Sequence, residues 1–341
     1  MSPLTLTGNF SSPKTVTVYG ATGNQGGSVV RSLVQNKSFN VIAITRNTSS
    51  KAAEDLRSLG VKLVRADGWK KEEIARAFAG SWAAFVNTNS DDPGPTEFDL
   101  GKVIIDGIVE AGTVKHLVYS SSISTFAFSD GKVYTQAAEM KSKIENYARD
   151  IGGFETVCSV YPGFFMEFFS SREMAVLSGG FPFFPDEDGV LTLRLPQWGS
   201  ECHRPIPWIA VKEDFGDIVH GILLEPKKYN KKPVQAFSDP RTFAEATIAF
   251  QSVFPKKRAR YIPQRSWEDF GAGIPGTEEI RSLFQFGQVC DAKYFGEEPM
   301  RVDVPAHLKA QASKAMGKGF QSQQLLQLED WFSNNLQHEV N

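Results

Sequence analysis

The sequence has 341 residues, with 37 Lys and Arg against 39 Asp and Glu, and therefore a formal net charge of −2. A chain of this length builds one large or two modest domains, and its balanced charge offers no general surface for nucleic acid. Its three cysteines have no metal-ligand spacing, which favours a reducing compartment and excludes a metal centre built on them. No apolar run reaches membrane-spanning length. We expect a cytoplasmic protein, with the nucleus as a second location, that binds neither a membrane nor nucleic acid directly.

The N-terminal region contains the strongest motif. After a polar stretch expected to be a flexible tail (1–13), an apolar run predicts a buried strand that ends in Gly20, Gly23 and Gly26, and a helical pattern follows. In this G-x-x-G-x-x-G spacing the first glycine permits a tight turn, the second lets a pyrophosphate approach the backbone, and the third lets the helix pack closely. The order strand, glycines, helix favours a dinucleotide site over a plain turn. The intervening residues are counted as cofactor contacts: Thr22, Asn24 and Gln25.

The residues after the second predicted strand (39–45) indicate which dinucleotide binds. An acid there would accept hydrogen bonds from the ribose 2′-hydroxyl of NAD, whereas an arginine can hold the 2′-phosphate of NADP. The sequence has Arg46 and no acid at this place, with Lys51 a few residues on. We therefore expect NADP(H) in preference to NAD(H). The alternative is that Arg46 is a solvated loop cation.

Alternating strands and helices continue through five predicted strands. Asp67 ends the third strand, where it contacts the adenine side of the cofactor or serves only the turn. Polar residues end the fourth and fifth strands, at the edge where ligands bind in open α/β sheets. This alternation predicts a Rossmann-type, doubly wound parallel sheet. The polar residues expected to contact the cofactor are Asn87, Thr88, Asn89, Ser120 and Ser121.

The helix predicted over 135–149 resembles the Tyr-x-x-x-Lys helix of short-chain dehydrogenases, but it lacks the tyrosine. Lys141 stands at the lysine position, and Ala137 is found four residues earlier. Tyr134 lies two turns before Lys141 and is a weak candidate for the missing acid. We expect Lys141 to contact the nicotinamide ribose and to be the tentative catalytic residue; the alternative is an exposed helix lysine.

The chain resembles the NmrA-like family of atypical short-chain dehydrogenases, over roughly residues 14–335. The resemblance is carried by 18–27, 45–47, 82–87, Lys141, 144–149, 161–167, 207–208 and 214–216. It implies binding of NADP or NAD. Some members of the family are cofactor sensors that pair with other proteins, including transcription regulators. Others, close to isoflavone and ether reductases, are enzymes that use a lysine at the Lys141 position without the tyrosine.

The C-terminal half is expected to form a smaller, discontinuous α/β lobe. Tyr161 ends a sixth predicted strand (156–161), and Gly163 and Phe164 follow it; all three are expected near the nicotinamide. The aromatic stretch that begins at Phe164 either packs into a core or forms an apolar wall of a cleft. Residues 187–198 suggest a hairpin over the cleft.

Three further features of this half are interpreted structurally. Asp214 is a credible N-terminal helix cap. His203 alone is a weak candidate proton donor, and the basic run at 256–258 is an ordinary solvated turn.

These patterns predict a cofactor domain over 14–160 and a substrate or partner lobe over 161–341, with segments that return to the sheet. The missing tyrosine favours an NADP(H)-dependent redox sensor that regulates a protein partner. The aromatic stretch favours the alternative, an NADPH-dependent reductase of a small apolar or aromatic substrate that uses Lys141. The oligomeric state does not follow from the sequence.

Overall fold

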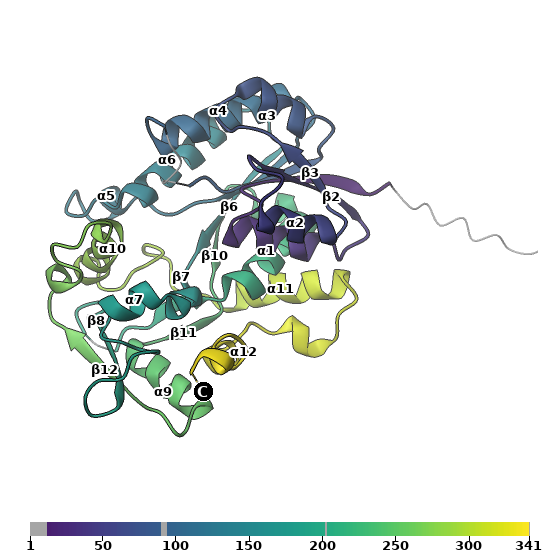
Figure 1. Cartoon of the computed structure of the whole chain (residues 1–341). Coiled ribbons are helices and arrows are strands. Elements are labelled where there is room, and N and C mark those ends of the chain that lie inside the picture. Colours follow the sequence, from purple (N-terminus) through teal and green to yellow (C-terminus); the bar gives the residue numbers. More distant parts are fainter. Residues whose placement is uncertain (1–11, 90–93, 202, 341) are drawn as a thin grey trace, which may run out of the picture.

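A computed structural model of the chain describes residues 12–89, 94–201 and 203–340. The expected tail, apart from residues 12 and 13, lies outside the described residues. Within the described residues, seven parallel strands form the main sheet in the order β10-β6-β5-β4-β1-β2-β3. Figure 1 labels β10 and β6 toward one edge of this sheet and β2 and β3 toward the other. These strands are β1 (Lys14–Tyr19), β2 (Phe39–Thr45), β3 (Lys62–Arg65), β4 (Ala83–Val86), β5 (His116–Ser120), β6 (Thr156–Pro162) and β10 (Pro233–Ala236).

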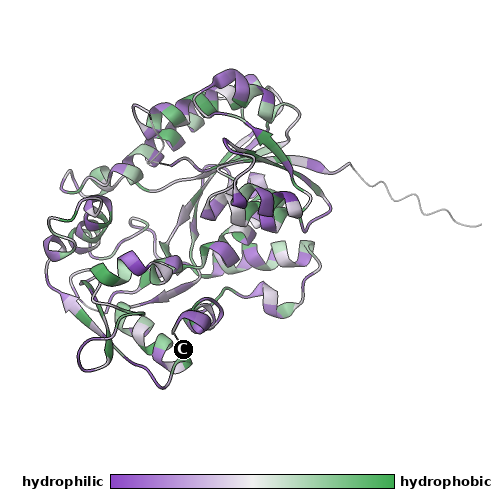
Figure 2. Ribbon diagram, in the orientation of Figure 1, coloured by the Kyte–Doolittle hydropathy of each residue, from purple (hydrophilic) through white to green (hydrophobic). Residues whose placement is uncertain are grey.

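Helices cover both faces of this sheet, because parallel strands need crossover connections. Apolar side chains alternate along each strand: Val16 and Val18 pack on the α1 side, and Tyr19 packs on the opposite side. Figure 2 shows the hydrophobic strands between helices whose outer faces are hydrophilic. One face carries α1 (Asn24–Leu33), α8 (Gly216–Leu224) and α11 (Asp303–Ala315); the other carries α3 (Lys71–Phe78), α4 (Glu97–Glu110) and α6 (Gln136–Asp150). The expected doubly wound fold is therefore confirmed.

The second lobe is built on two small sheets around an aromatic core. Within the described residues, β11, β9 and β7 form one sheet, and β12 pairs with β8 in the other. Phe169, Trp208, Phe250 and Phe332 are fully buried between them. The strands are β7 (Phe164–Phe165), β8 (Val190–Pro196), β9 (Ile206–Ile209), β11 (Asp239–Arg241) and β12 (Arg258–Gln264).

The remaining helices connect these parts. A capping box between Thr242 and Glu245 begins α9. The helices are α2 (Lys51–Ser58), α5 (Thr125–Phe128), α7 (Arg172–Leu177), α9 (Phe243–Val253), α10 (Glu278–Val289) and α12 (Leu328–Val340). Short 3₁₀ or π segments are η1 (Met166–Ser170), η2 (Val211–Phe215), η3 (Pro226–Tyr229), η4 (Trp267–Asp269) and η5 (Phe320–Gln323).

The C-terminal half of the chain returns to the main sheet. Strand β10 pairs with β6 at its edge, and α8 packs against both α1 and α11. Close approach of the helices requires small residues: a Cβ on Gly216 would lie 2.1 Å from the Ser28 carbonyl oxygen. The two lobes are therefore interleaved in the sequence.

The expected hairpin over 187–198 is wrong. A single strand, β8, occupies this stretch, and it pairs in parallel with the distant β12, from Val190 opposite Arg258 onward. Leu191, Leu193 and Leu195 are buried in the aromatic core. The apolar side of this strand therefore packs into the lobe instead of covering a cleft.

Asp214 is structural, but it is not a helix cap. It lies inside the helical turn η2, which continues into α8. Its fully buried carboxylate accepts hydrogen bonds from the Ser238 hydroxyl and the Leu326 N–H and pairs with the Lys309 ammonium. A buried carboxylate needs such partners, so tertiary packing rather than a helix end determines its position.

Candidate functional site

A pocket of about 560 Å³ opens at the carboxyl ends of β1, β2 and β4. Strands β2 and β4 flank β1 on opposite sides, so the pocket lies where the strand order reverses, the usual ligand site of an open α/β sheet. Its size suits a bound nucleotide cofactor. The expected cofactor residues that line it are Gly20, Thr22, Gly23, Asn24, Gln25, Arg46, Asn87, Thr88 and Asn89.

The glycine turn leaves space above the start of α1. Gly20 has a φ of +75°, and a Cβ there would lie 2.7 Å from the Asn87 carbonyl oxygen. Gly26 does not line the pocket. It faces the inside of the turn, where a Cβ on it would lie 2.2 Å from the Gly20 oxygen. At Gly23 a Cβ would meet only that oxygen, at 3.4 Å, and no side chain caps the helix. The N-terminal N–H groups and the positive end of α1 fit a pyrophosphate.

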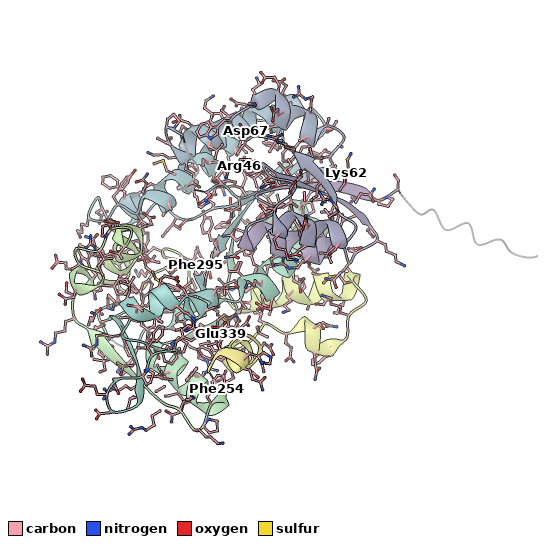
Figure 3. The ribbon with its side chains drawn as sticks, viewed as in Figure 1. Arg46, Lys62, Asp67, Phe254, Phe295 and Glu339 are labelled. Carbon is pink, nitrogen blue, oxygen red and sulfur yellow. The ribbon has the colours of Figure 1, made fainter. Side chains whose placement is uncertain are left out.

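The three residues expected near the adenosine lie in different places. Arg46 lines the pocket and also a neighbouring depression of about 680 Å³, which Asp67 and Lys62 line. Figure 3 shows Arg46, Asp67 and Lys62 in the upper part of the view. Asp67 serves its own turn, since its carboxylate accepts the Trp69 N–H at 3.1 Å. Lys51 is 84% exposed and pairs with Asp55 on α2, outside the pocket.

Ser120 and Ser121 lie at the end of β5, below the pocket. The Ser120 hydroxyl donates to Gln25 Oε1 at 2.6 Å, which joins β5 to the start of α1. The Ser121 hydroxyl lies 3.3 Å from the Lys141 carbonyl oxygen. Both are buried, so they hold α1 and α6 in place rather than project into the pocket.

The residues after β6 separate into different environments. The Tyr161 hydroxyl donates to Glu145 at 3.1 Å, and burial raises the pKa of this tyrosine. At Gly163 a Cβ would lie 1.9 Å from the Pro207 carbonyl oxygen, so this glycine permits close contact with β9. Phe164 packs into the second core, whereas Phe165 lines the pocket.

Most of the aromatic stretch therefore belongs to the second core. Phe164, Phe169 and Phe181 are buried there, and their rings contact one another or Trp208. The wall interpretation applies to Phe165, which borders the pocket beside Thr88 and Asn89.

Lys141 extends from α6 to two residues that line the pocket, although it does not line the pocket itself. Its ammonium donates to Asn87 Oδ1 at 3.1 Å, to the Thr88 carbonyl oxygen at 2.8 Å and to Glu97 Oε1 at 3.0 Å. The side chain is 18% exposed. Burial lowers the pKa of Lys141, and the negative charge of Glu97 partly offsets that change. Lys141 is therefore not an exposed helix lysine.

Tyr134 and His203 lie apart from this arrangement. Tyr134 precedes α6, is 51% exposed, and its ring packs edge-on against Phe126. It does not line the pocket. His203 is exposed, in agreement with the weak weight given to it as a proton donor.

Sequence reasoning missed Glu97. It is the first residue of α4, where an acid is common simply because the positive helix end attracts it. Its side chain is nevertheless only 1% exposed and contacts Lys141. The available signal was an acid at the start of a predicted helix. Only the packing of α4 on α6 brings this acid and Lys141 together.

The described residues, 12–89, 94–201 and 203–340, contain neither a membrane-spanning helix nor a metal-binding cluster. None of their helices is long and apolar enough to cross a membrane. No group of three or more potential ligands among them could hold a metal ion.

The fold and pocket define an α/β protein of the Rossmann type. The NmrA-like family profile matches residues 12–317, so the chain belongs to that family. The NmrA-like family domain-containing oxidoreductase cpsB of Aspergillus campestris is 56% identical, with 93% of this chain and 95% of that protein covered. The similarly named notA′ of Aspergillus versicolor is 50% identical, with coverage of 95% and 97%.

Solved structures agree in fold. Nmra, a negative transcriptional regulator determined in complex with NADP, superposes with a TM-score of 0.74 at 21% identity, with 97% of each chain covered. The same protein has been determined with NAD, also with a TM-score of 0.74. At this identity the likeness concerns the fold.

These comparisons correct the expectation of a sensor. Three relatives that are at least 50% identical to this chain over nearly their whole length are named oxidoreductases. The transcriptional regulator is only 21% identical. The sensor interpretation is therefore wrong. The missing tyrosine misled it, because the absence of one proton donor does not by itself exclude catalysis.

Proposed function

We propose that the chain is an NADPH-dependent oxidoreductase that reduces a carbonyl or imine group of a small apolar or aromatic substrate. One observation carries this proposal above the others. The Lys141 ammonium is hydrogen-bonded to Asn87 and to Thr88, two of the residues that line a nucleotide-sized pocket. The full-length oxidoreductase relatives support it.

The residues of the pocket divide the work of binding. Gly20 and Gly23 leave the start of α1 open to the pyrophosphate, and Gly26 keeps the helix close beneath it. Arg46, at the end of β2, would hold the 2′-phosphate, which favours NADP(H) over NAD(H). The bound nicotinamide would supply a hydride.

Lys141 would supply the proton in this proposal. Hydride addition to a C=O or C=N bond places negative charge on the heteroatom, which then needs a proton. The Lys141 ammonium carries one at Nζ, where an N–H held by Asn87 or by the Thr88 carbonyl would turn to the substrate, and burial makes it a better acid than an exposed lysine because it lowers the pKa. Phe165 gives the pocket an apolar, aromatic border suited to an apolar substrate.

The test combines cofactor binding with turnover. NADPH binding is followed by nicotinamide fluorescence, and NADPH oxidation by absorbance, with a panel of aromatic and aliphatic ketones, imines and quinones. We expect binding, multiple turnovers with at least one acceptor, and at least a hundredfold loss of turnover in Lys141→Ala. Lys143→Ala is the matched control, because Lys143 is an exposed lysine on the same helix. Absence of NADPH binding, or turnover retained in Lys141→Ala, would refute the proposal.

A further inference from the structure

Lys141 contacts a buried acid, Glu97, whose side chain is not needed to cap the helix that it begins. Glu97 begins α4, yet Thr96 provides the cap by accepting the Asp99 N–H at 3.1 Å. The Glu97 side chain is turned away from solvent and is 1% exposed. The position of this carboxylate therefore needs another explanation than the helix end.

Glu97 belongs to one hydrogen-bonded network with Lys141. Its Oε1 accepts the Lys141 ammonium at 3.0 Å and the Thr88 hydroxyl at 2.6 Å. The Thr88 oxygen also lies 2.9 Å from the Tyr119 hydroxyl. Because the Thr88 proton points to Glu97, the buried Tyr119 is the donor in that bond. Elements α4 and α6 and the segment after β4 thus meet at a single carboxylate oxygen, and β5 joins the network through Tyr119 and Thr88.

The second oxygen of Glu97 is the unusual feature. Oε2 is buried and has no hydrogen-bond partner among the described residues. An unsatisfied buried carboxylate oxygen costs on the order of 1–3 kcal/mol or more. Each such group in a native protein needs an explanation, and a catalytic role is one of them.

The charge acts on Lys141. An ammonium has three N–H donors, and those of Lys141 meet Asn87 Oδ1, the Thr88 carbonyl oxygen and Glu97 Oε1. Of these acceptors only Glu97 is charged. Burial favours the neutral amine, and the Glu97 carboxylate opposes this by raising the pKa of Lys141.

Other titratable groups around α6 have their own partners. On the same helix, Glu145 pairs with Arg149 at 2.5 Å and accepts the Tyr161 hydroxyl from β6. Tyr119 of β5 faces Glu97 through Thr88, and burial raises its pKa, so it stays neutral. The charge that meets the Lys141 ammonium directly is that of Glu97.

We propose that Glu97 is the positioning residue for Lys141: it holds the ammonium against the end of β4 and keeps it protonated for transfer to the substrate. This inference rests on the proposed oxidoreductase function. It explains how the chain retains a proton donor although Ala137 stands where short-chain dehydrogenases have a tyrosine.

The test measures Lys141 itself as well as turnover. In a chain labelled with ¹³C-lysine, the Lys141 Cε resonance is assigned by its loss in Lys141→Arg and is titrated in the wild type and in Glu97→Gln. The amide keeps the shape of the side chain and removes the charge. We expect the Lys141 titration in the variant to fall by about one to three pH units. The alkaline limb of kcat should fall with it, so that the variant loses more turnover at alkaline than at acidic pH.

Two further variants separate positioning from general structure. Asp99→Asn removes a carboxylate on the same turn that does not contact Lys141, and we expect the wild-type titration. Glu97→Asp keeps the charge but retracts it by one methylene, so the titration should stay within about half a pH unit of the wild type while kcat falls. If Glu97→Gln does not fold, Glu97→Asp carries the test, and an unchanged kcat in it overturns the proposal.

The outcomes also distinguish the two proposals. A Lys141 titration and a pH profile that are unchanged in Glu97→Gln overturn the role of Glu97, whatever the activity of the wild type. A shifted titration in a protein that never oxidises NADPH supports the pairing of Glu97 with Lys141 but contradicts the oxidoreductase function.

Discussion

Two glycines of the N-terminal turn predict opposite consequences of the same substitution. A methyl group on Gly26 would lie 2.2 Å from the Gly20 oxygen, 2.6 Å from the Gly20 carbonyl carbon and 2.9 Å from the Ala21 Cα. These atoms belong to the backbone and cannot rotate away. A methyl group on Gly23 would have one neighbour within 4 Å, at 3.4 Å, and the φ of −84° there suits alanine.

The expected magnitudes differ accordingly. Gly26→Ala must displace α1 from the end of β1, and overpacking of this kind costs about 1–3 kcal/mol of unfolding free energy. Gly23→Ala keeps the fold within about 1 kcal/mol, since alanine is only a poorer residue than glycine at this helix cap. Its methyl group, however, points into the space proposed for the pyrophosphate. We expect a loss of NADPH affinity of at least a hundredfold.

The assay is thermal or urea unfolding with and without NADPH. A ligand at 100 times its Kd stabilises the folded state by about 2.7 kcal/mol, so the wild type should show a clear shift. Gly23→Ala should unfold like the wild type without NADPH and lose the shift. Gly26→Ala should be destabilised without ligand. Wild-type NADPH affinity in Gly23→Ala, or wild-type stability in Gly26→Ala, would refute the reasoning from these distances.

The remaining predictions concern charge. Arg46→Ala should weaken NADPH binding by about 10- to 100-fold and leave NADH binding unchanged, whereas the outward-facing Lys51→Ala should change neither; equal losses for both cofactors would contradict the 2′-phosphate role. Burial lowers the pKa of His220 to about 4, so below pH 6.5 the unfolded chain binds a proton at this histidine and the folded chain does not. Up to ~3 kcal/mol of unfolding free energy is therefore lost as the pH falls from 6.5 to 4. In urea unfolding, His220→Leu should lose less stability than the wild type over that range. Lys309→Met should lower the free energy of unfolding in urea by about 3–5 kcal/mol, because it leaves the buried Asp214 carboxylate without its cation. Adding Asp214→Asn should recover part of this loss, whereas losses that simply add in the double variant would contradict a coupled ion pair.

The sequence alone was sufficient for the first six strands of the main sheet, because their patterns are local, whereas the structure was needed to place β10 at its edge. Apolar runs closed by glycines and separated by amphipathic stretches specify strands and crossover helices, and parallel pairing leaves few topologies. The glycine spacing likewise located the turn at Gly20, Gly23 and Gly26 before its shape was known. Arg46 and the run of 87–89 followed from the rule that ligands bind where strands end.

The position of a side chain after its strand or helix was decided by the tertiary structure. Phe164 and Phe165 are adjacent and identical in kind, yet one packs into the second core and the other borders the pocket. Lys51 and Arg46 are both cations near the same strand end, and the helix α2 turns one of them outward. Chain order does not encode these differences.

Charge pairing shows the same division between sequence and tertiary structure. The sequence determined the fold class and placed Lys141 on a helix opposite the strand ends, because helical period and strand order are local patterns. It did not indicate that Glu97 or Asp214 would be buried, since an acid at a helix start is ordinarily solvated. Only the packing of α4 on α6, and of α11 on α8, brings a lysine within reach of each acid. Because that packing also buries the carboxylates, each of them needs a paired cation.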